Sequence, residues 1–274
     1  MLRYFDQHCH CRVSPDSEAP MRLMAESARD HGMELVCFTD HVDMDDDRTG
    51  APMIEWQGRW ETALAEWNAV TADPPKGIEL RLGMELGEAN HQPEAARTAA
   101  ARPELDFVLG SLHNLRNTMD FYHIPYASEA ECDRWNRKYL AELRELAAVD
   151  FYDVMAHIGY TSRYMHRRGF SSAITPEEYR EELEDIFRTL IQGGRGIEVN
   201  VSGLREGHTT YPTAPVLSLY RELGGEIITV GSDAHDGAAA GVAVREGFEL
   251  LESLGFRYVA RFTKRKPEFI RIGG

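Results

Sequence analysis

Histidine and carboxylate side chains repeatedly stand at the ends of short hydrophobic runs in this chain. The first run ends in His8 and His10, and the last is followed by Asp233 and His235. The runs between them end in single residues of the same kinds, namely His41, Glu85, His113 and His157. Imidazole nitrogens and carboxylate oxygens are common protein ligands for divalent transition metals. The recurrence predicts one cluster of metal ligands at one end of a bundle of parallel strands, where α/β barrel enzymes carry their chemistry.

The spacing within these groups suits shared coordination. His8 and His10 are two residues apart, and Asp233 and His235 repeat that spacing. Because side chains alternate between the two faces of a strand, residues two apart share a face and can reach one divalent ion. A carboxylate such as Glu85 can bridge two cations and offset part of their charge. His41 considered alone could equally be a capping or packing residue, and it is the presence of the other residues that favours ligation.

Strand-like and helical segments alternate along the chain in a way that would bring these ligands together. Hydrophobic β-rich runs predict seven strands, at roughly residues 3–8, 34–39, 79–85, 106–112, 152–157, 196–201 and 226–231. Segments of helical period lie between them, which is typical of βα units around a parallel sheet. We therefore expect an α/β fold. Residues 256–272 are expected to form two short edge strands joined around Lys266-Pro267.

Two helix starts carry the capping-box pattern, in which a Ser or Thr and a Glu three residues later exchange hydrogen bonds with backbone N–H groups. One is Ser128 with Glu131. The other is Thr175 with Glu178, where Pro176 suits the first helical position. Both starts predict helices that pack an apolar stripe against the core.

Length and composition are those of an ordinary folded domain. The chain has 274 residues, 43% of them hydrophobic, and α/β barrels commonly reach about 250 residues around a single core. We expect residues 1–274 to form one domain. No run approaches the roughly 18 uninterrupted apolar residues of a membrane span, and Met1 leads into a strand-like run with no signal-peptide pattern. We therefore expect a cytoplasmic protein with no membrane partner.

Charge and cysteine usage narrow the expected partners further. A formal net charge of −15 argues against nonspecific binding of nucleic acid, because an acidic surface repels the phosphate backbone. A local basic site for an anionic substrate stays compatible with that charge. The four cysteines lie inside expected strands or helices and not at the spacings of a disulfide framework, so reduced thiols are expected.

A series of short motifs, spread over nearly the whole chain, carries a family resemblance. The motifs are His8-x-His10, Asp16, Thr39-Asp40-His41, Gly83-Met84-Glu85, Gly110-Ser111-Leu112-His113, Ala156-His157 and Gly231-Ser232-Asp233-Ala234-His235. Their types and order resemble the PHP (polymerase and histidinol phosphatase) superfamily. The resemblance implies a distorted (β/α)7 barrel with a site for three divalent metal ions, in agreement with the number of strands expected from the hydrophobic pattern.

Carried over residue by residue, the resemblance implies three groups of metal ligands. The first is His8, His10, Glu85 and Asp233, the second is Glu85, His113 and His157, and the third is Asp16, His41 and His235. At two positions the chain departs from the family pattern. Asp16 stands where many members have histidine, and Gly159 stands where relatives often have an acidic residue that supports the imidazole two positions earlier.

Such a site suits phosphate chemistry. Divalent ions held by a few carboxylates keep a net positive charge that attracts a phosphate dianion, and they lower the pKa of water from about 15.7 towards about 7 for attack on phosphorus. Arg163 and Arg205 stand on loops expected to overhang the site, where they would bind phosphate oxygens and stabilise the transition state. Histidine and carboxylate ligands accept zinc, iron or manganese, so the identity of the ions stays open.

The segments 110–113 and 198–205 are similar to the histidinol-phosphate phosphatase branch of the superfamily. This similarity implies a metal-dependent phosphomonoesterase that hydrolyses L-histidinol phosphate, a small phosphorylated partner, to L-histidinol and phosphate in histidine biosynthesis. One alternative is a PHP phosphoesterase for nucleotides or other small phosphate esters, because loops set leaving-group selectivity. A second is a metal-dependent amide or lactone hydrolase, and a third is a nonenzymatic metal module, although structural metal sites are usually closed by protein ligands.

Polar residues outside the motifs have more ordinary interpretations. His31 is expected to cap a helix C-terminus, and His91 to be solvated in a polar loop. The run Asp43, Asp45, Asp46 and Asp47 is either a solvated loop or a surface that attracts a cationic leaving group. The loop histidines that are candidates for contacting the substrate or protonating the leaving alcohol are His123, His166 and His208.

Overall fold

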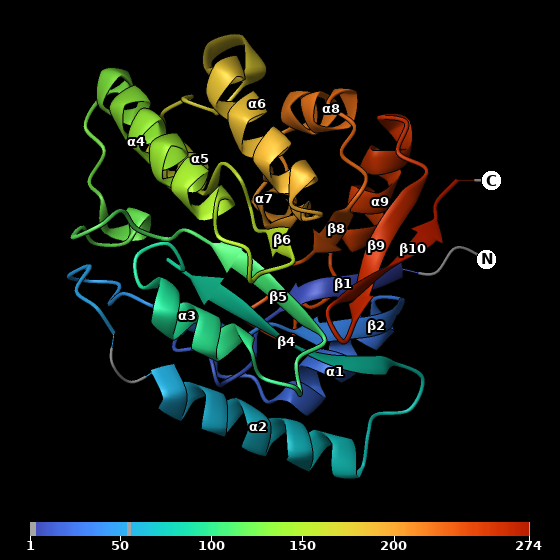
Figure 1. Cartoon of the computed structure of the whole chain (residues 1–274). Coiled ribbons are helices and arrows are strands. Elements are labelled where there is room, and N and C mark those ends of the chain that lie inside the picture. The colour runs from blue at the N-terminus through green and yellow to red at the C-terminus, as the bar shows by residue number, and fades with distance from the viewer. Residues whose placement is uncertain (1–3, 54–55, 274) are drawn as a thin grey trace.

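The computed structural model describes residues 4–53 and 56–273, and a nearly closed barrel of parallel strands lies at its centre (Figure 1). The order around the barrel is β1 (Tyr4–Cys9), β2 (Met33–Phe38), β4 (Glu79–Gly87), β5 (Phe107–Ser111), β6 (Val154–Met155), β7 (Gly196–Asn200) and β8 (Ile228–Gly231). A short additional strand, β3 (His41–Asp43), pairs with β4. The distorted (β/α)7 barrel is therefore confirmed, and β3 is a strand that the hydrophobic pattern did not indicate.

The barrel closes where the end of β1 meets the segment that follows β8. The backbone N–H of Asp233 donates to the His8 carbonyl at 2.7 Å, and the N–H of His10 donates to the Ala234 carbonyl at 2.9 Å. Beside this contact, the buried Asp6 carboxylate accepts from the N–H of Ser232 at 2.9 Å. Closure therefore places the histidines of β1 directly beside the acid and histidine that follow β8.

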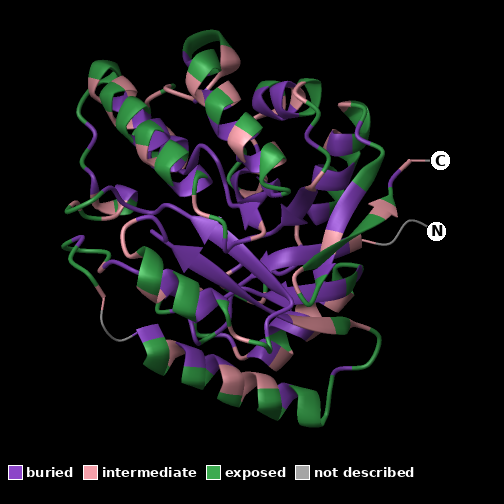
Figure 2. Cartoon of the chain, viewed as in Figure 1, coloured by how far each residue is buried: buried purple, intermediate pink, exposed green. Residues whose placement is uncertain are grey.

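Helices cover the outside of the barrel (Figure 1). They are α1 (Met21–Asp30), α2 (Trp56–Ala72), α3 (Pro93–Ala100), α4 (Glu129–Ala147), α5 (Tyr160–Arg167), α6 (Pro176–Gln192), α7 (Ser202–Arg205), α8 (Ala214–Glu222) and α9 (Val244–Ser253), with a 3-10 turn η1 (Phe121–His123). Figure 2 shows the barrel strands buried almost throughout and the helices exposed along one side. This burial on both faces accounts for the nearly continuous apolar runs of the strands.

The C-terminal hairpin, β9 (Tyr258–Thr263) and β10 (Lys266–Arg271), fills the end of the barrel at which the strands begin. Ala260 and Phe262 of β9 pack with the side chains of Phe107, Leu109 and Val154 inside the barrel. In the described sheets β9 and β10 pair with each other alone, so both are edge strands as expected, and the contacts of Ala260 and Phe262 bury part of β9. The turn lies at Lys264 and Arg265, both at positive φ, and Pro267 stands within β10.

The two predicted helix starts differ in how they are capped. The Ser128 hydroxyl accepts a hydrogen bond from the N–H of Glu131 at 3.2 Å, as predicted for the start of α4. Helix α6 begins at Pro176 as predicted, but the side chain of Thr175 makes no capping hydrogen bond. The preference of proline for the first helical position therefore accounts for the start of α6, and the predicted side-chain cap does not contribute.

Two sequence-based expectations concern covalent and membrane features. The four cysteines are buried and unpaired, so the expectation of free thiols is confirmed. Among the helices of residues 4–53 and 56–273, none combines the length and the apolar character that crossing a bilayer requires.

His91, on the loop between β4 and α3, is buried, so the prediction of a solvated side chain is wrong. Its Nδ1 lies 2.6 Å from Asp45 Oδ2, and its Nε2 lies 2.6 Å from Glu142 Oε2. Burial disfavours the imidazolium, but the hydrogen bonds to the two carboxylates outweigh burial and raise the pKa of His91 to about 9. The charged ring therefore joins the acidic loop to α4.

We expect His91→Gln to destabilise the protein in a pH-dependent way. The pKa is raised in the folded state, so the stabilisation is fully present below the unfolded value of about 6.5 and is lost as the pH rises through about 9. After allowance for solvent screening, the difference in unfolding free energy should be about 2 kcal/mol near pH 6. Urea unfolding at pH 6 and pH 9.5 measures it. His31→Gln, at an exposed histidine, is the control, and an equal His91→Gln effect at both pH values would contradict the assignment.

Candidate metal centre

The carboxyl ends of the barrel strands bring all of the predicted metal ligands together. Ion-pair distances of 2.8 to 3.8 Å connect His8, His10, Asp16, His41, Glu85, His113, His157, Asp233 and His235 into one cluster. His8, His10 and Glu85 have no exposed surface. Parallel strands that end at one edge of a barrel account for this convergence of residues that are far apart in the chain.

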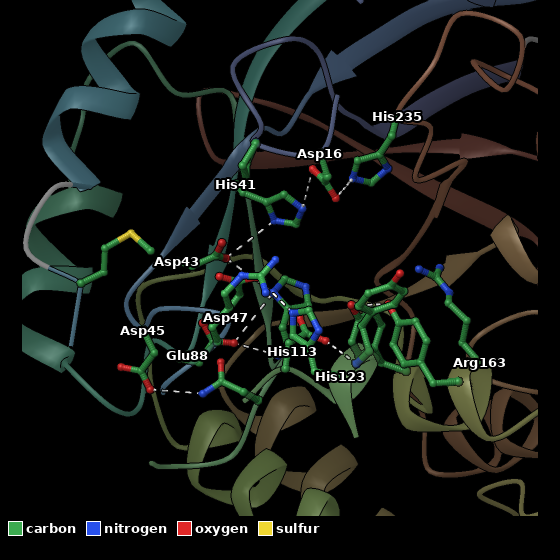
Figure 3. Close-up of a pocket in the computed structure, with 18 of the residues that line it drawn as sticks. Asp16, His41, Asp43, Asp45, Asp47, Glu88, His113, His123, Arg163 and His235 are labelled. Atoms are coloured by element: carbon green, nitrogen blue, oxygen red, sulfur yellow. Dashed lines mark hydrogen bonds and ion pairs between the residues drawn. The ribbon is translucent and has the colours of Figure 1, made fainter. Parts of the chain in front are cut away.

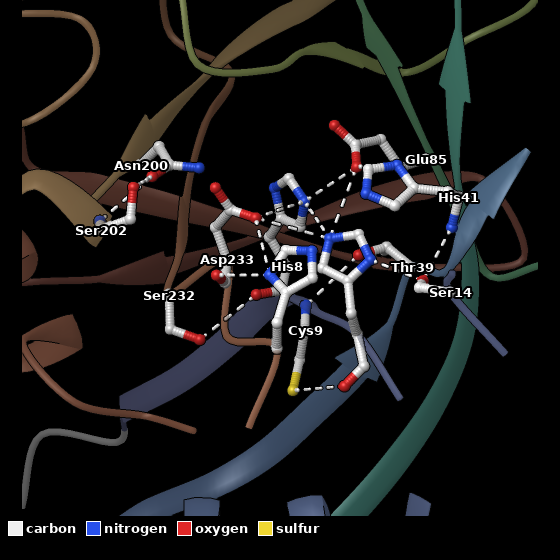
Figure 4. A network of polar contacts seen from close by, with 12 residues as sticks. His8, Cys9, Ser14, Thr39, His41, Glu85, Asn200, Ser202, Ser232 and Asp233 are labelled. Carbon is white, nitrogen blue, oxygen red and sulfur yellow. Dashed lines mark hydrogen bonds and ion pairs between the residues drawn. The ribbon is translucent and has the colours of Figure 1, made fainter. Parts of the chain in front are cut away.

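Four distances within the first predicted group match a tetrahedral metal site, and the fifth, between the Nε2 atoms of His8 and His10, is shorter at 3.0 Å. His8 Nε2 lies 3.3 Å from Glu85 Oε2 and 3.6 Å from Asp233 Oδ1. His10 Nε2 lies 3.4 Å from the same Glu85 oxygen and 3.5 Å from the same Asp233 oxygen. Ligands bound tetrahedrally at about 2.0 to 2.2 Å stand about 3.3 to 3.6 Å apart. The four atoms therefore fit one divalent ion between them (Figure 4).

The second predicted group uses the other oxygen of Glu85. Glu85 Oε1 lies 3.1 Å from His113 Nε2 and 2.8 Å from His157 Nε2. Since Oε2 faces His8 and His10, the carboxylate presents one oxygen to each group. This is the arrangement that a bridging carboxylate requires.

The third predicted group lies on the open side of the cluster. Asp16 Oδ2 lies 3.1 Å from His235 Nε2, and Asp16 Oδ1 lies 3.8 Å from His41 Nε2. The Asp16 side chain is 57% exposed, whereas that of Glu85 is fully buried. An ion in this group would therefore be the most accessible to solvent.

The electrostatics of the cluster favour added positive charge. Burial opposes ionisation of Glu85, but His8, His41 and His113 outweigh burial and hold the pKa of this carboxyl well below its usual value. Burial lowers the pKa of His8, but the negative charges of Glu198, Glu85 and Asp233 outweigh burial and raise this pKa above its usual value. Glu85 Oε2 and His41 Nδ1 also lack a hydrogen-bond partner among the described residues. Histidine and carboxylate donors at these distances fit divalent metal ions, so the cluster supports metal dependence.

Ser14 and Asp40 orient one of these histidines. His10 Nδ1 lies 2.9 Å from Ser14 Oγ, which donates a hydrogen bond to Asp40 Oδ1 at 2.8 Å. Because the hydroxyl donates to Asp40, it accepts from Nδ1–H of His10 and leaves Nε2 for the cluster. The sequence motifs include Asp40 without assigning it a role, and no sequence pattern indicated Ser14.

A cavity of about 630 Å³ opens beside the cluster and is lined by both acidic and basic side chains (Figure 3). Asp16, His41, His113 and His235 form part of its wall. One side carries acidic side chains, and Figure 3 shows Arg163 on the side away from Asp45 and Glu88. Besides Asp16, the acidic lining residues are Asp43, Asp45, Asp47, Glu88 and Asp120, which outnumber the arginines beside them, Arg48 and Arg59. The cavity can therefore hold a small molecule that is anionic at one end and cationic at the other.

A model of the PHP domain family matches residues 6–202 of the chain, which is well over half of its length. This chain belongs to the PHP family. The histidinol-phosphatase of Lactococcus lactis subsp. lactis is 26% identical over 272 residues, which cover 97% of this chain and 96% of that protein. A protein of Clostridium acetobutylicum named probable histidinol-phosphatase is 25% identical over 266 residues, which cover 97% of this chain and 99% of that protein.

A solved structure has the same fold as this PHP protein. It is the crystal structure of histidinol phosphate phosphatase from L. lactis in complex with zinc, L-histidinol and phosphate. The two structures align with a TM-score of 0.80 at 24% sequence identity, and the alignment covers 98% of this chain and 100% of the other. Because the sequence identity is low, the alignment establishes the shared barrel only.

The two arginines predicted to bind phosphate take different places in the PHP barrel. Arg163, 11% exposed, donates through Nη2 to Asp233 Oδ2 at 2.7 Å and lines the cavity. Arg205 donates to the carbonyls of Ser232 at 2.5 Å and Asp233 at 3.3 Å, and it is absent from the described lining. The structure therefore favours a positioning role for Arg205 at the turn after β8 in place of the predicted phosphate contact.

The aspartate run after His41 divides between the cavity and the surface. Asp43, Asp45 and Asp47 line the cavity, whereas Asp46 Oδ1 accepts from the N–H of Thr49 at 2.9 Å in an exposed turn. The solvated-loop interpretation therefore fits Asp46, and attraction of a cationic leaving group stays a prediction for the other three.

Glu88 is a buried carboxylate of the PHP cavity that the sequence did not indicate. Its Oε1 accepts from the N–H of His113 at 2.7 Å, and its Oε2 has no hydrogen-bond partner among the described residues. Burial raises the pKa of Glu88 to about 8. The backbone at Glu88 has φ of 52°, a conformation that is uncommon for residues other than glycine and often marks functional sites. No periodicity or spacing in the sequence predicts this strained position.

His157 lacks the support that the family pattern often supplies. Its Nδ1 is buried without a hydrogen-bond partner among the described residues. Two positions later, where relatives often have an acidic residue, Gly159 has φ of 100°, which favours glycine over any residue with a side chain. The backbone conformation is the physical reason for the departure at this position.

Only one of the three loop histidines considered as substrate contacts is among the described lining residues. His123 lines the cavity, with Nε2 3.3 Å from Asp47 Oδ2. His166 and His208 face each other, with ring centroids 5.1 Å apart, and do not belong to that lining.

Proposed function

We propose that this PHP protein is a metal-dependent phosphomonoesterase that hydrolyses L-histidinol phosphate to L-histidinol and inorganic phosphate. The observation that carries the proposal is the division of one cavity between the ligand cluster with Arg163 and a wall of carboxylates. Histidinol phosphate has a phosphate dianion at one end, an imidazole at the other and an amine between them, which matches that division. The names of the curated relatives support the same substrate, and residues 1–274 would act as one domain.

We assign the ligand cluster to three divalent ions, in the groups given above, with zinc, iron or manganese as the candidates. When bound, the ions supply charge that neutralises the phosphoryl oxygens and lowers the pKa of water for attack on phosphorus. Glu85 would hold the first two ions at a fixed separation through its two oxygens. Zinc in the lactococcal structure supports this class of ion.

Arg163 would contribute at the phosphate end of the cavity. Its guanidinium is held between the rings of Tyr160 and Tyr211, at 5.3 and 5.5 Å from their centroids, and is tied to Asp233. Its Nε is buried without a hydrogen-bond partner among the described residues. A fixed arginine with a remaining N–H donor is suited to a phosphoryl oxygen.

The acidic wall would bind the cationic leaving group. Asp47 and Asp120 line the cavity, and the exposed ring of Tyr122 stands at its rim beside Tyr164, with ring centroids 5.7 Å apart. Carboxylates attract the amine, and aromatic rings favour contact with a cation or with an imidazole. His123, which pairs with Asp47, is the histidine placed to deliver a proton to the leaving alcohol.

We expect the double variant Asp47→Asn/Asp120→Asn to lower kcat/KM for histidinol phosphate by about tenfold, since two attractive charges at partly exposed positions are lost. Turnover of phenyl phosphate, which has no cationic group, should stay unchanged. Asp46→Asn is the matched control, because that neighbouring carboxylate faces Thr49 instead of the cavity. Equal losses for the two substrates would contradict a role in recognising the cation.

The proposed function is tested by steady-state kinetics of metal-reconstituted protein on a panel of esters. Histidinol phosphate should exceed nucleoside monophosphates and phenyl phosphate in kcat/KM by about a hundredfold, given the ionic contacts that only it can make. A preference for nucleotides would favour a PHP phosphoesterase for nucleotides. Turnover of amides or lactones without phosphatase activity would favour a metal-dependent amide or lactone hydrolase.

A further inference from the structure

Strand β7 supplies no residue to the predicted ligand cluster, yet its polar side chains contact members of that cluster. Glu198 and Asn200 are two residues apart and share one face of β7, and Ser202 begins helix α7 directly after the strand. All three are buried. Buried polar groups are costly without hydrogen bonds, and these side chains find their partners at the metal centre.

Glu198 contacts one histidine from each of the first two ligand groups. Its Oε1 lies 2.7 Å from His8 Nδ1, and its Oε2 accepts from the backbone N–H of His157 at 2.9 Å. Because a carboxylate accepts only, it holds a proton on Nδ1 of His8 and directs Nε2 towards Glu85 and Asp233. Gly231 permits this contact, since a Cβ there would lie 2.4 Å from Glu198 Oε1.

The same face of β7 continues from Glu198 to a third ligand. Asn200 Nδ2 donates to Glu198 Oε2 at 3.3 Å, and Asn200 Oδ1 accepts from the hydroxyl of Ser202 at 2.6 Å. The Ser202 hydroxyl in turn accepts from Arg163 Nη2, which also donates to Asp233 Oδ2 at 2.7 Å. The network therefore begins at His8 and ends at Asp233, two ligands of the same predicted ion. Figure 4 shows its middle members, Asn200 and Ser202.

We propose that Glu198, Asn200 and Ser202 form a positioning network through which β7 sets the metal affinity of the centre. The network orients the imidazole of His8, holds the backbone of His157 at its positive φ of 22°, and fixes the second oxygen of Asp233. It acts on the ligands and does not contact the ions or the substrate. The proposal rests on metal binding by the cluster and is independent of which phosphoester is hydrolysed.

Glu198→Gln tests the proposal in the full chain. The amide keeps the shape of the side chain but replaces one acceptor oxygen by a donor, so it cannot accept from both His8 and His157. Zinc affinity of the metal-free protein, measured by competition with a chromophoric chelator, should fall about 10- to 100-fold. Glu142→Gln is the matched control, because Glu142 also faces an imidazole, that of His91 at 2.6 Å, outside the cluster. The zinc affinity of the Glu142→Gln protein should equal that of the wild type.

A second variant and a spectroscopic signal keep the test informative if Glu198→Gln does not fold. Ser202→Ala removes the link between Asn200 and Arg163 and should weaken zinc binding about fivefold, the effect of one lost hydrogen bond. The visible absorption of bound cobalt should change in both variants and not in Glu142→Gln, because it reports ligand geometry. Wild-type zinc affinity and cobalt spectra in both network variants would overturn the proposal. So would equal weakening in Glu198→Gln and Glu142→Gln.

Discussion

Glu85→Gln should abolish phosphatase activity and lower the amount of bound metal. The two oxygens of Glu85 face different ligand groups, at 2.8 to 3.4 Å from four histidine Nε2 atoms. Glutamine would leave one acceptor and turn an amide N–H₂ towards the other group. We expect kcat to fall about a thousandfold or more, because metal-based stabilisation is worth several kcal/mol and each 1.36 kcal/mol is a factor of ten. Phosphate release and metal analysis of the same samples measure both effects.

Glu79→Gln is the matched control for this prediction. Glu79 begins the same strand, but its side chain is 48% exposed and pairs with Arg81 at 2.5 Å. The control should keep wild-type activity and metal content. A Glu85→Gln protein that retains full metal and more than a tenth of the activity would contradict the bridging assignment.

Removal of metal by a chelator is the second change with a large expected effect. Activity should fall below detection and return on addition of zinc or manganese, because the water and the phosphoryl oxygens lose the charge that activates them. The protein should also lose stability, since metal at a thousand times its dissociation constant contributes about 4 kcal/mol to the folded state. Phosphate release and thermal unfolding, before and after chelation, are the measurements.

The chelation experiment also separates the enzyme from the nonenzymatic alternative. Its control is the same chelator already saturated with zinc, which should change neither activity nor unfolding. A protein that binds metal, gains stability from it and turns over no phosphoester would instead support a structural metal module.

Sequence patterns predicted the strands and the ligand types well because both depend on local order. Strand β4 was expected at residues 79–85 and spans Glu79–Gly87, and the predicted metal ligand Glu85 lies on it. A parallel strand that enters a barrel must end at the rim, so a histidine or carboxylate at the end of an apolar run is placed by the strand itself. The repeated pattern was therefore sufficient to indicate the cluster.

Local sequence patterns did not predict the contacts between segments that are far apart in the chain. His91 was expected in solvent because its neighbours are polar, but Asp45 and Glu142 come from other segments and bury it. The hairpin turn was expected around Lys266-Pro267 but lies at Lys264 and Arg265, and no local pattern indicated that Ala260 and Phe262 enter the open end of the barrel. No local sequence pattern indicates Glu88, because its environment depends on contacts with a different segment, such as the N–H of His113.

The sequence by itself determined which residues can bind metal, since side-chain chemistry and a spacing of two are properties of the chain alone. Only the tertiary structure decided which oxygen of Glu85 faces which histidine, and that Arg163 lines the cavity while Arg205 holds the turn after β8. It also decided that Glu198 of β7 contacts two predicted ligands, His8 on β1 and His157 after β6. The physical reason is barrel closure, which sets distances between strands that no local period in the sequence encodes.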